Sequence, residues 1–141
     1  MYEFYVGTTP KDPPGNIVKV CLDSDGQLVD KSYYEAVSPA YLCRKGSCIY
    51  AVIENADFGG VQVFDVNKNG SLTAKARLDT EDVYSTYISA EKRGNRIFVA
   101  NYGTPSCAVY RYEAEKLVQE SVLREKKTEK SHIHCAALTP E

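Results

Sequence analysis

The sequence predicts an all-β fold built from repeated four-stranded antiparallel sheets, and three observations lead to that prediction. Short apolar segments recur along the chain, Gly, Asn and Asp residues separate them, and no segment has the clear periodicity of a long helix. A unit of about 45 residues occurs three times. Repeats of this length and composition are typical of β-propeller blades, which bury their faces only against neighbouring blades. We therefore expect about three blades of a larger ring.

The three copies of the repeat align at aromatic and glycine positions. An apolar strand led by an aromatic residue starts each alignment, at Tyr5, Tyr50 and Phe98. In the first two copies the next strand ends at a polar turn with a final glycine, at residues 23–26 and 67–70. Glycine favours such turns because it adopts positive φ without steric cost. Both segments are predicted hairpins.

A further strand precedes two of the aromatic-led strands, at residues 40–42 and 86–90. The order strand, glycine turn, strand, loop, strand, glycine turn, strand is that of a four-stranded antiparallel meander. Residues 113–124 have some helical character, but the repeat assigns them to a turn and an outer strand. Aromatic residues at matching positions are predicted to form the core between blades. These residues are Tyr5, Tyr50, Phe64, Phe98 and Tyr110.

Composition narrows the class of protein. The chain has 11 Tyr, no Trp and a formal net charge of −2, so it offers no broad basic surface for nucleic acid. No apolar run approaches the roughly 20 residues of a membrane span, and the N-terminus lacks the features of a signal peptide. The expectation is a cytoplasmic protein with neither a nucleic-acid nor a membrane partner.

The five cysteines form no Cys-x-x-Cys pair and are odd in number. In a cytoplasmic chain most of them are expected to be small buried apolar residues rather than disulfides or metal ligands. Cys43 and Cys48 flank the turn at Gly46 closely enough to suggest a bridge. A reducing compartment argues against one.

Six segments carry a resemblance to a known family. They are Tyr5-Val6-Gly7-Thr8, Pro39-Ala40-Tyr41-Leu42, Tyr50-Ala51-Val52-Ile53-Glu54, Gly59 to Phe64, Phe98-Val99-Ala100-Asn101-Tyr102-Gly103 and Ser131-His132-Ile133-His134-Cys135. In order and spacing the chain resembles the bacterial β-propeller 6-phosphogluconolactonases and the related muconate lactonizing enzymes. The resemblance implies a seven-bladed ring, with residues 1–141 as the N-terminal portion of one propeller domain, apparently truncated. Missing blades or self-association are therefore expected.

The resemblance implies hydrolysis of 6-phospho-D-glucono-1,5-lactone to 6-phosphogluconate, a reaction of the pentose phosphate pathway that needs no cofactor. This chemistry requires a base for the attacking water, donors for the developing oxyanion and cations for the phosphate. Two positions depart from the family pattern: Ile53 replaces a common Asn, and Tyr87 replaces a common His. These departures and the short chain favour an alternative, a non-catalytic propeller fragment or binding platform. A muconate-type lactone cyclase is a third possibility within the same fold.

His132 and His134 are the only histidines and are the first catalytic candidates. Two residues apart on a predicted strand, they face the same side. The resemblance makes this strand the innermost of its blade, lining the central channel. An imidazole is a suitable base near neutral pH. Two alternatives remain: polar channel residues that hydrogen-bond neighbouring blades, or a metal site shared with Glu54.

Polar residues at strand ends complete the predicted site. Glu54 is the third catalytic candidate, and Asn101 and Tyr102 occupy the equivalent position one blade later, where they could orient sugar hydroxyls or satisfy turn backbone. The resemblance assigns phosphate binding to Lys127, where the family tends to carry Arg. The alternative for the charged run 124–130 is a solvated loop.

Overall fold

The computed structural model describes residues 1–9, 15–126 and 131–139, and this part of the chain contains eleven β-strands in three antiparallel sheets and no helix. Consequently no helix that could span a membrane occurs in it. The first sheet consists of β1 (Tyr2–Gly7), β2 (Gly15–Leu22) and β3 (Leu28–Ala36). The second consists of β4 (Leu42–Lys45), β5 (Cys48–Val52), β6 (Gly59–Val66) and β7 (Leu72–Thr80). The third consists of β8 (Ser85–Ala90), β9 (Arg96–Asn101), β10 (Ser106–Glu113) and β11 (Lys116–Arg124).

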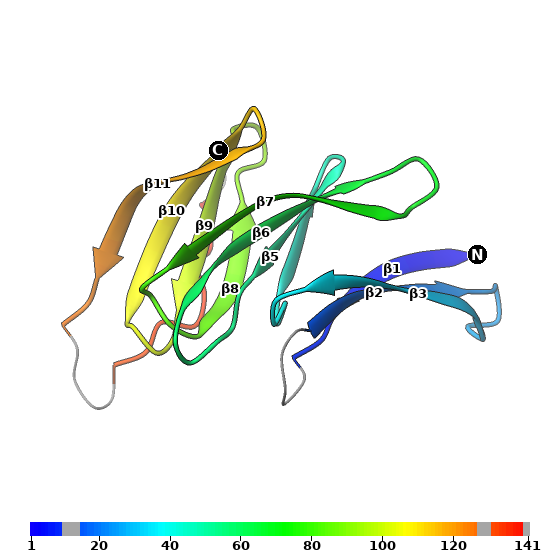
Figure 1. Cartoon of the computed structure of the whole chain (residues 1–141), viewed down its shortest axis with the longest axis horizontal. Helices are drawn as coiled ribbons and strands as arrows, with labels where there is room; N and C mark the ends of the chain where they lie inside the picture. Colours follow the sequence, from blue (N-terminus) through cyan, green and yellow to red (C-terminus); the bar gives the residue numbers. More distant parts are fainter. Residues whose placement is uncertain (10–14, 127–130, 140–141) are drawn as a thin grey trace.

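Each sheet is a meander whose strands pair in chain order, and the three sheets stand in a row (Figure 1). The sheet of β1–β3 lies at one end of the row and the sheet of β8–β11 at the other. The predicted four-stranded blade is confirmed for the second and third sheets. The first sheet has three strands in the described part of the chain, and β1 is equivalent to the second strand of the other sheets. Residues 113–124 form a turn and an outer strand, as the repeat predicts.

The two polar turns of the repeat have the expected geometry. Asp23 Oδ1 accepts hydrogen bonds from the backbone N–H groups of Asp25 and Gln27, at 2.9 and 2.8 Å. Gly26 and Gly70 close the two turns with φ values of 79° and 75°, in the region that glycine adopts freely. These short polar segments therefore form the hairpins β2–β3 and β6–β7.

The apolar core fills the two spaces between the sheets. The first and second sheets enclose one cluster, whose buried members are Ile17, Ala36, Ile49, Ala51 and Phe64. The second and third sheets enclose a larger cluster, whose buried members are Tyr50, Val52, Val61, Val63, Ile88, Ile97, Val99, Ala108 and Tyr110. The core prediction is confirmed for Tyr50, Phe64 and Tyr110, whereas Tyr5 and Phe98 are half-buried. The fold thus depends on face-to-face packing of successive sheets.

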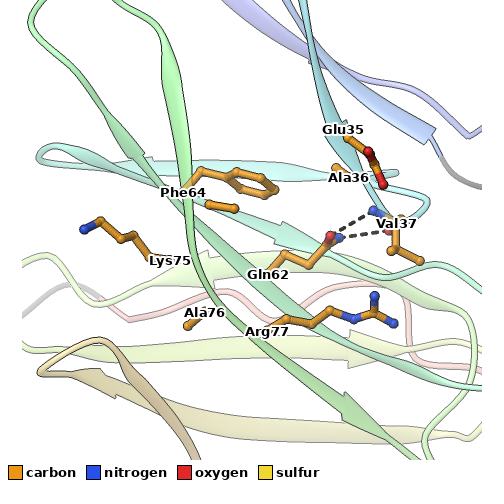
Figure 2. A pocket seen from close by; sticks show the side chains of 9 residues that line it. Glu35, Ala36, Val37, Gln62, Phe64, Lys75, Ala76 and Arg77 are labelled. Carbon is orange, nitrogen blue, oxygen red and sulfur yellow. Dashed lines mark hydrogen bonds between the residues drawn. The ribbon is translucent and has the colours of Figure 1, made fainter.

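A buried glutamine links the first two sheets near their outer strands (Figure 2). Gln62 on β6 accepts a hydrogen bond from the Val37 N–H at 2.8 Å and donates one to the Val37 carbonyl oxygen at 2.9 Å. The side chain satisfies both backbone groups of a residue that follows β3 and belongs to no strand. A hollow of about 490 Å³ beside it is lined partly by Lys75 and Arg77 on β7.

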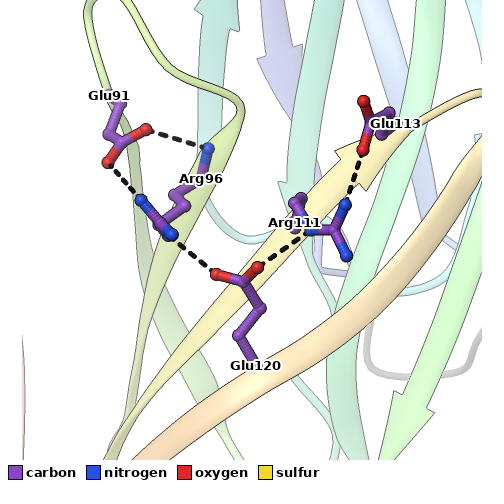
Figure 3. Close-up of polar contacts among 5 residues, drawn as sticks. All are labelled: Glu91, Arg96, Arg111, Glu113 and Glu120. Atoms are coloured by element: carbon purple, nitrogen blue, oxygen red, sulfur yellow. Dashed lines mark hydrogen bonds and ion pairs between the residues drawn. The ribbon is translucent and has the colours of Figure 1, made fainter.

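Charged side chains connect three strands of the third sheet (Figure 3). Glu120 on β11 accepts hydrogen bonds from Arg96 on β9 and Arg111 on β10, at 2.7 and 2.8 Å. Glu91 and Glu113 extend the network at its two ends. The two guanidinium groups lower the pKa of the Glu120 carboxyl from its ordinary value of 4.5, Arg96 contributing most.

The cysteines are less buried than the sequence predicts. All five are free thiols; Cys21 is buried, Cys43, Cys48 and Cys107 are half-buried, and Cys135 is exposed. Cys43 and Cys48 pack against the larger apolar cluster without being enclosed by it, and only Cys21 is buried, so the expectation that most of the cysteines are buried is wrong. In the β4–β5 hairpin Cys43 lies opposite Tyr50, and Cys48 lies opposite Lys45. The two thiols are therefore offset along the hairpin rather than directly paired.

Candidate functional site

A pocket of about 320 Å³ lies where the second sheet, the third sheet and the C-terminal segment meet. Its lining is Glu54, Tyr84, Thr86, Tyr102 and His134. Glu54 follows β5, Tyr102 follows β9, and His134 belongs to the segment 131–139. Three side chains predicted from sequence, Glu54, Tyr102 and His134, are thus brought together in one pocket.

A repeated backbone contact positions Glu54 and Tyr102. The Glu54 N–H donates to the Ser38 carbonyl oxygen at 3.0 Å, and the Tyr102 N–H donates to the Tyr84 carbonyl oxygen at 2.9 Å. Ser38 and Tyr84 each precede an inner strand and each has positive φ, 39° and 51°. Such backbone strain in residues other than glycine is concentrated at functional sites. The repeat therefore holds the residues after β5 and β9 in equivalent places on successive sheets.

Both histidines contact the ring of Tyr102. The His132 imidazole stacks on it with a centroid distance of 3.9 Å and an interplanar angle of 0°, and His134 meets it edge-on at 4.8 Å. His132 Nδ1 lies 3.1 Å from the Tyr102 carbonyl oxygen. Because a carbonyl oxygen only accepts hydrogen bonds, Nδ1 carries the proton, and in the neutral ring Nε2 keeps a free lone pair.

The segment 131–139 does not form the strand that the sequence predicts. A strand requires a ladder of backbone hydrogen bonds, and no strand in the described part of the chain pairs with this segment. Ser89 on β8 ties it to the third sheet, because its hydroxyl donates to the Ala136 carbonyl oxygen at 2.9 Å. Both histidines are exposed.

Asn101 lies in the interior instead of lining the pocket. Its side chain is fully buried, accepts a hydrogen bond from the Ser85 hydroxyl at 2.7 Å and donates one to the Ser106 hydroxyl at 2.9 Å. The Ser85 hydroxyl also accepts from the Gly60 N–H at 3.1 Å. Asn101 therefore joins three strands of the third sheet, and Ser85 connects this network to the second sheet. The other predicted binding residue, Lys127, lies outside the described residues.

The two departures from the family pattern occupy different surroundings. Ile53 is fully buried, so it contributes no polar group to the pocket. Tyr87 on β8 packs against Tyr41 with ring centroids 4.6 Å apart. Burial is the largest cause of the raised pKa of the Tyr87 hydroxyl. A phenol thus stands where the family resemblance leads one to expect an imidazole.

The donor set of the site is phenols, a hydroxyl, a carboxylate and an imidazole. In residues 1–9, 15–126 and 131–139, no three His, Cys, Asp or Glu side chains gather into a group that could hold a metal ion. The pocket lining contains neither Lys nor Arg. Sequence reasoning missed Tyr84 and Thr86. The signal for Tyr84 was its place in the repeat, because it precedes Tyr87 by the same interval as Ser38 precedes Tyr41.

Comparison with known proteins relates this geometry to a family. Residues 3–141 match the family model of lactonases described as seven-bladed β-propellers. The chain belongs to this lactonase family. An uncharacterised protein of Staphylococcus epidermidis is 24% identical over 150 residues, an alignment that covers 97% of the lactonase-family chain and 44% of the relative. A protein of Staphylococcus saprophyticus is 25% identical with the same coverage.

Two solved structures share the arrangement of sheets. A candidate 6-phosphogluconolactonase from Bacteroides fragilis superposes with a TM-score of 0.79 at 22% identity. A protein from Lactobacillus plantarum superposes with a TM-score of 0.75 at 19% identity. Each comparison covers 96% of the lactonase-family chain and 42% of the solved chain. The chain therefore spans less than half the length of the relatives and structures that it matches.

Proposed function

We propose that this chain forms part of a propeller lactonase that hydrolyses 6-phospho-D-glucono-1,5-lactone to 6-phosphogluconate in the cytoplasm, as a step of the pentose phosphate pathway. The observation that carries the proposal is the meeting of Glu54, Tyr102 and His134 in one pocket at the strand ends of a lactonase-family chain. The description of the Bacteroides fragilis neighbour supports the choice of substrate. The reaction as proposed needs no cofactor.

The proposed chemistry is general-base hydrolysis of a cyclic ester. A base takes a proton from water as the water oxygen attacks the lactone carbonyl carbon, and the carbonyl oxygen becomes an oxyanion. Collapse of this intermediate breaks the bond between the carbonyl carbon and the ring oxygen. The base returns its proton to that oxygen, which becomes the hydroxyl of the open-chain acid.

We assign the base to His134, because its imidazole lines the pocket together with Glu54, Tyr84 and Tyr102. Glu54 lines the same pocket as His134 and is the third catalytic candidate. The phenol hydroxyls of Tyr84 and Tyr102 are donors for the oxyanion. His132 would position Tyr102 through its ring stack and its hydrogen bond to the Tyr102 carbonyl oxygen.

The phosphate part of the proposal depends on a cation. The described lining of the pocket contains no Lys or Arg, so it suits a sugar ring but does not supply the permanent cation that a phosphate dianion requires. Lys127 is the residue proposed for this role. Lys has one ammonium group rather than the planar fork of Arg, so we expect a point-charge contact with the phosphate.

The test is the rate of 6-phosphogluconolactone hydrolysis by the purified 141-residue chain above the spontaneous rate. We expect the double variant His132→Ala/His134→Ala to lose about 10²-fold or more of that acceleration, the usual contribution of a general base. Gln119→Ala, an exposed change on β11, is the matched control and should keep full activity. No acceleration by the unmodified chain would favour the alternative of a non-catalytic fragment or binding platform.

A substrate panel separates the lactonase candidates. The chain should hydrolyse unphosphorylated gluconolactone more slowly than the phosphorylated lactone. In Lys127→Ala the rates for the two lactones should be closer to each other. Equal hydrolysis rates for both lactones would show that the site does not recognise the phosphate group. Turnover of muconolactone alone would favour the muconate-type cyclase.

A further inference from the structure

A buried polar network links the second sheet to the third. The residues Ser85, Asn101 and Ser106 are fully buried. The Ser85 hydroxyl donates to Asn101 Oδ1 at 2.7 Å, and Asn101 Nδ2 donates to the Ser106 hydroxyl at 2.9 Å. From the second sheet, the Gly60 N–H donates to the Ser85 hydroxyl at 3.1 Å. Groups from two sheets therefore depend on one another for their hydrogen bonds.

The repeat shows that a sheet of this kind can be built without such a network. At the three equivalent positions of the second sheet, no side chain can form a hydrogen bond. These residues are Pro39, Ile53 and Gly60. Ile53 is fully buried, and its N–H donates to the Gly60 carbonyl oxygen at 3.0 Å, so backbone bonding suffices there. Because buried polar groups are costly unless each is paired, polar side chains at these positions of the third sheet indicate a role beyond folding.

The network adjoins three of the residues that line the pocket. Tyr84 and Thr86 flank Ser85 along the chain, and Tyr102 directly follows Asn101. Because neighbours along a strand point to opposite sides, the burial of Ser85 and Asn101 turns Thr86 and Tyr102 toward the pocket. A shift of either buried side chain would therefore move the pocket lining.

Tyr84 is held in a strained backbone conformation between the second and third sheets. Its φ of 51° is uncommon for a bulky residue. Its N–H donates to the carbonyl oxygen of Asn55, the neighbour of Glu54, at 2.9 Å, and its own carbonyl oxygen accepts from the Tyr102 N–H at 2.9 Å. Strained residues persist only where the surrounding structure fixes them, and they cluster at functional sites. The hydrogen bonds of Ser85, the next residue, supply such a constraint.

We infer that Ser85 and Asn101 are positioning residues, whose hydrogen bonds hold Tyr84 and Tyr102 in the places that the pocket requires. Neither Ser85 nor Asn101 lines the pocket itself. Their part in hydrolysis rests on the proposed function, in which the two phenols donate to the oxyanion. The positioning rests on hydrogen bonds and burial alone, and it can be tested without a substrate.

The test compares Asn101→Leu and Ser85→Ala with the unmodified chain by hydrogen exchange. Leucine is close to asparagine in size but forms no side-chain hydrogen bond, and Ser85→Ala removes a single hydroxyl. In both variants the amides of Tyr84 and Tyr102 should exchange about tenfold faster or more, because their surroundings open locally. The matched control is Ile97→Val, which removes a buried methylene at the other end of β9 and should leave both exchange rates unchanged.

The NMR resonances of the His132 ring give a second measurement. This ring stacks on that of Tyr102 at 3.9 Å, so its proton resonances depend on where the Tyr102 ring lies. In Asn101→Leu and Ser85→Ala the resonances should move toward those of an unstacked imidazole, and in Ile97→Val they should not. The double variant Ser85→Ala/Asn101→Leu should move them no further than Asn101→Leu alone, since members of one network are not additive.

Unchanged amide exchange and unchanged His132 resonances in both variants would overturn the inference, as would equal changes in Ile97→Val. Circular dichroism checks that each variant keeps its β-structure, and Ser85→Ala decides the question if Asn101→Leu does not fold. Where the chain hydrolyses the lactone, Asn101→Leu should lower kcat by about 10- to 100-fold, and a kcat equal to that of Ile97→Val would overturn the part in hydrolysis. Absence of hydrolysis by the unmodified chain would count against the proposed function alone, because exchange and resonances do not depend on turnover.

Discussion

The imidazole of His132 lies parallel to the phenol ring of Tyr102, with centroids 3.9 Å apart and Nδ1 3.1 Å from the Tyr102 carbonyl oxygen. This contact joins the C-terminal segment to the residue that follows β9. Tyr102 thus takes part in two contacts, because it lines the pocket and its ring face packs against His132.

Removing the ring should loosen the C-terminal segment. In Tyr102→Leu we expect faster hydrogen exchange of residues 131–139, because an aromatic pair contributes about 0.5–1.5 kcal/mol beyond the area it buries. Tyr102→Phe keeps the ring and should keep the protection, although it loses the hydroxyl. Equal exchange rates in the two variants would show that the stack does not hold the segment.

Truncating Gln62 should destabilise the contact between the first two sheets. Gln62→Ala leaves the Val37 N–H and carbonyl without their partners, and each unsatisfied buried group costs about 1–3 kcal/mol. For a chain of this size we expect a Tm lower by roughly 2–4 °C for each kcal/mol. Gln119→Ala, exposed on β11, is the matched control. A Tm equal to that of the control would mean that water replaces both bonds without loss.

Gly60 should tolerate no side chain. A Cβ at this position would lie 2.0 Å from the Leu78 carbonyl oxygen, and the backbone φ of 137° is one that other residues rarely adopt. Strain and overpacking together should lower the free energy of unfolding of Gly60→Ala by about 2 kcal/mol or more. Gly26 also has positive φ, but a Cβ there would meet no other atom. Gly26→Ala should therefore lower the free energy of unfolding by only about 1 kcal/mol. If denaturant unfolding showed similar losses of unfolding free energy for Gly60→Ala and Gly26→Ala, the steric argument would be refuted.

The ion pairs of Glu120 should make stability depend on pH on the acid side. The pKa of its carboxyl is lowered in the folded state, so its stabilising contribution is present above the unfolded pKa near 4.5 and is lost as the pH falls through the lowered folded value. Glu120→Gln should therefore be less stable than the unmodified chain at pH 7, with a difference that shrinks below about pH 4.5.

Denaturant unfolding across this pH range measures the Glu120 effect. Glu125→Gln is the control, an exposed carboxylate outside the ion-pair network of Figure 3. A difference between Glu120→Gln and the unmodified chain that stays constant from pH 7 to the acid limb would contradict the electrostatic explanation.

Local sequence determined much of the fold. Strand and turn residues alternate so regularly that the meander and the hairpins at residues 23–26 and 67–70 could be predicted, because turn chemistry acts over a few residues. The repeat also identified Tyr50 and Tyr110 as core, since a repeated position has the same neighbours in each sheet. The strand ends that hold Glu54 and Tyr102 followed from the same alignment.

Tertiary structure decided what the repeat could not. Asn101 and Tyr102 are adjacent in sequence, yet one is buried between Ser85 and Ser106 while the other lines the pocket, because alternate strand residues face opposite sides. Phe4 is 43% exposed, and residues 131–139 form no backbone hydrogen-bond ladder with a described strand. Both properties depend on which sheet lies beside these residues. Sequence determined which segments are strands by short-range preference, whereas burial and site geometry are properties of neighbours distant in the chain.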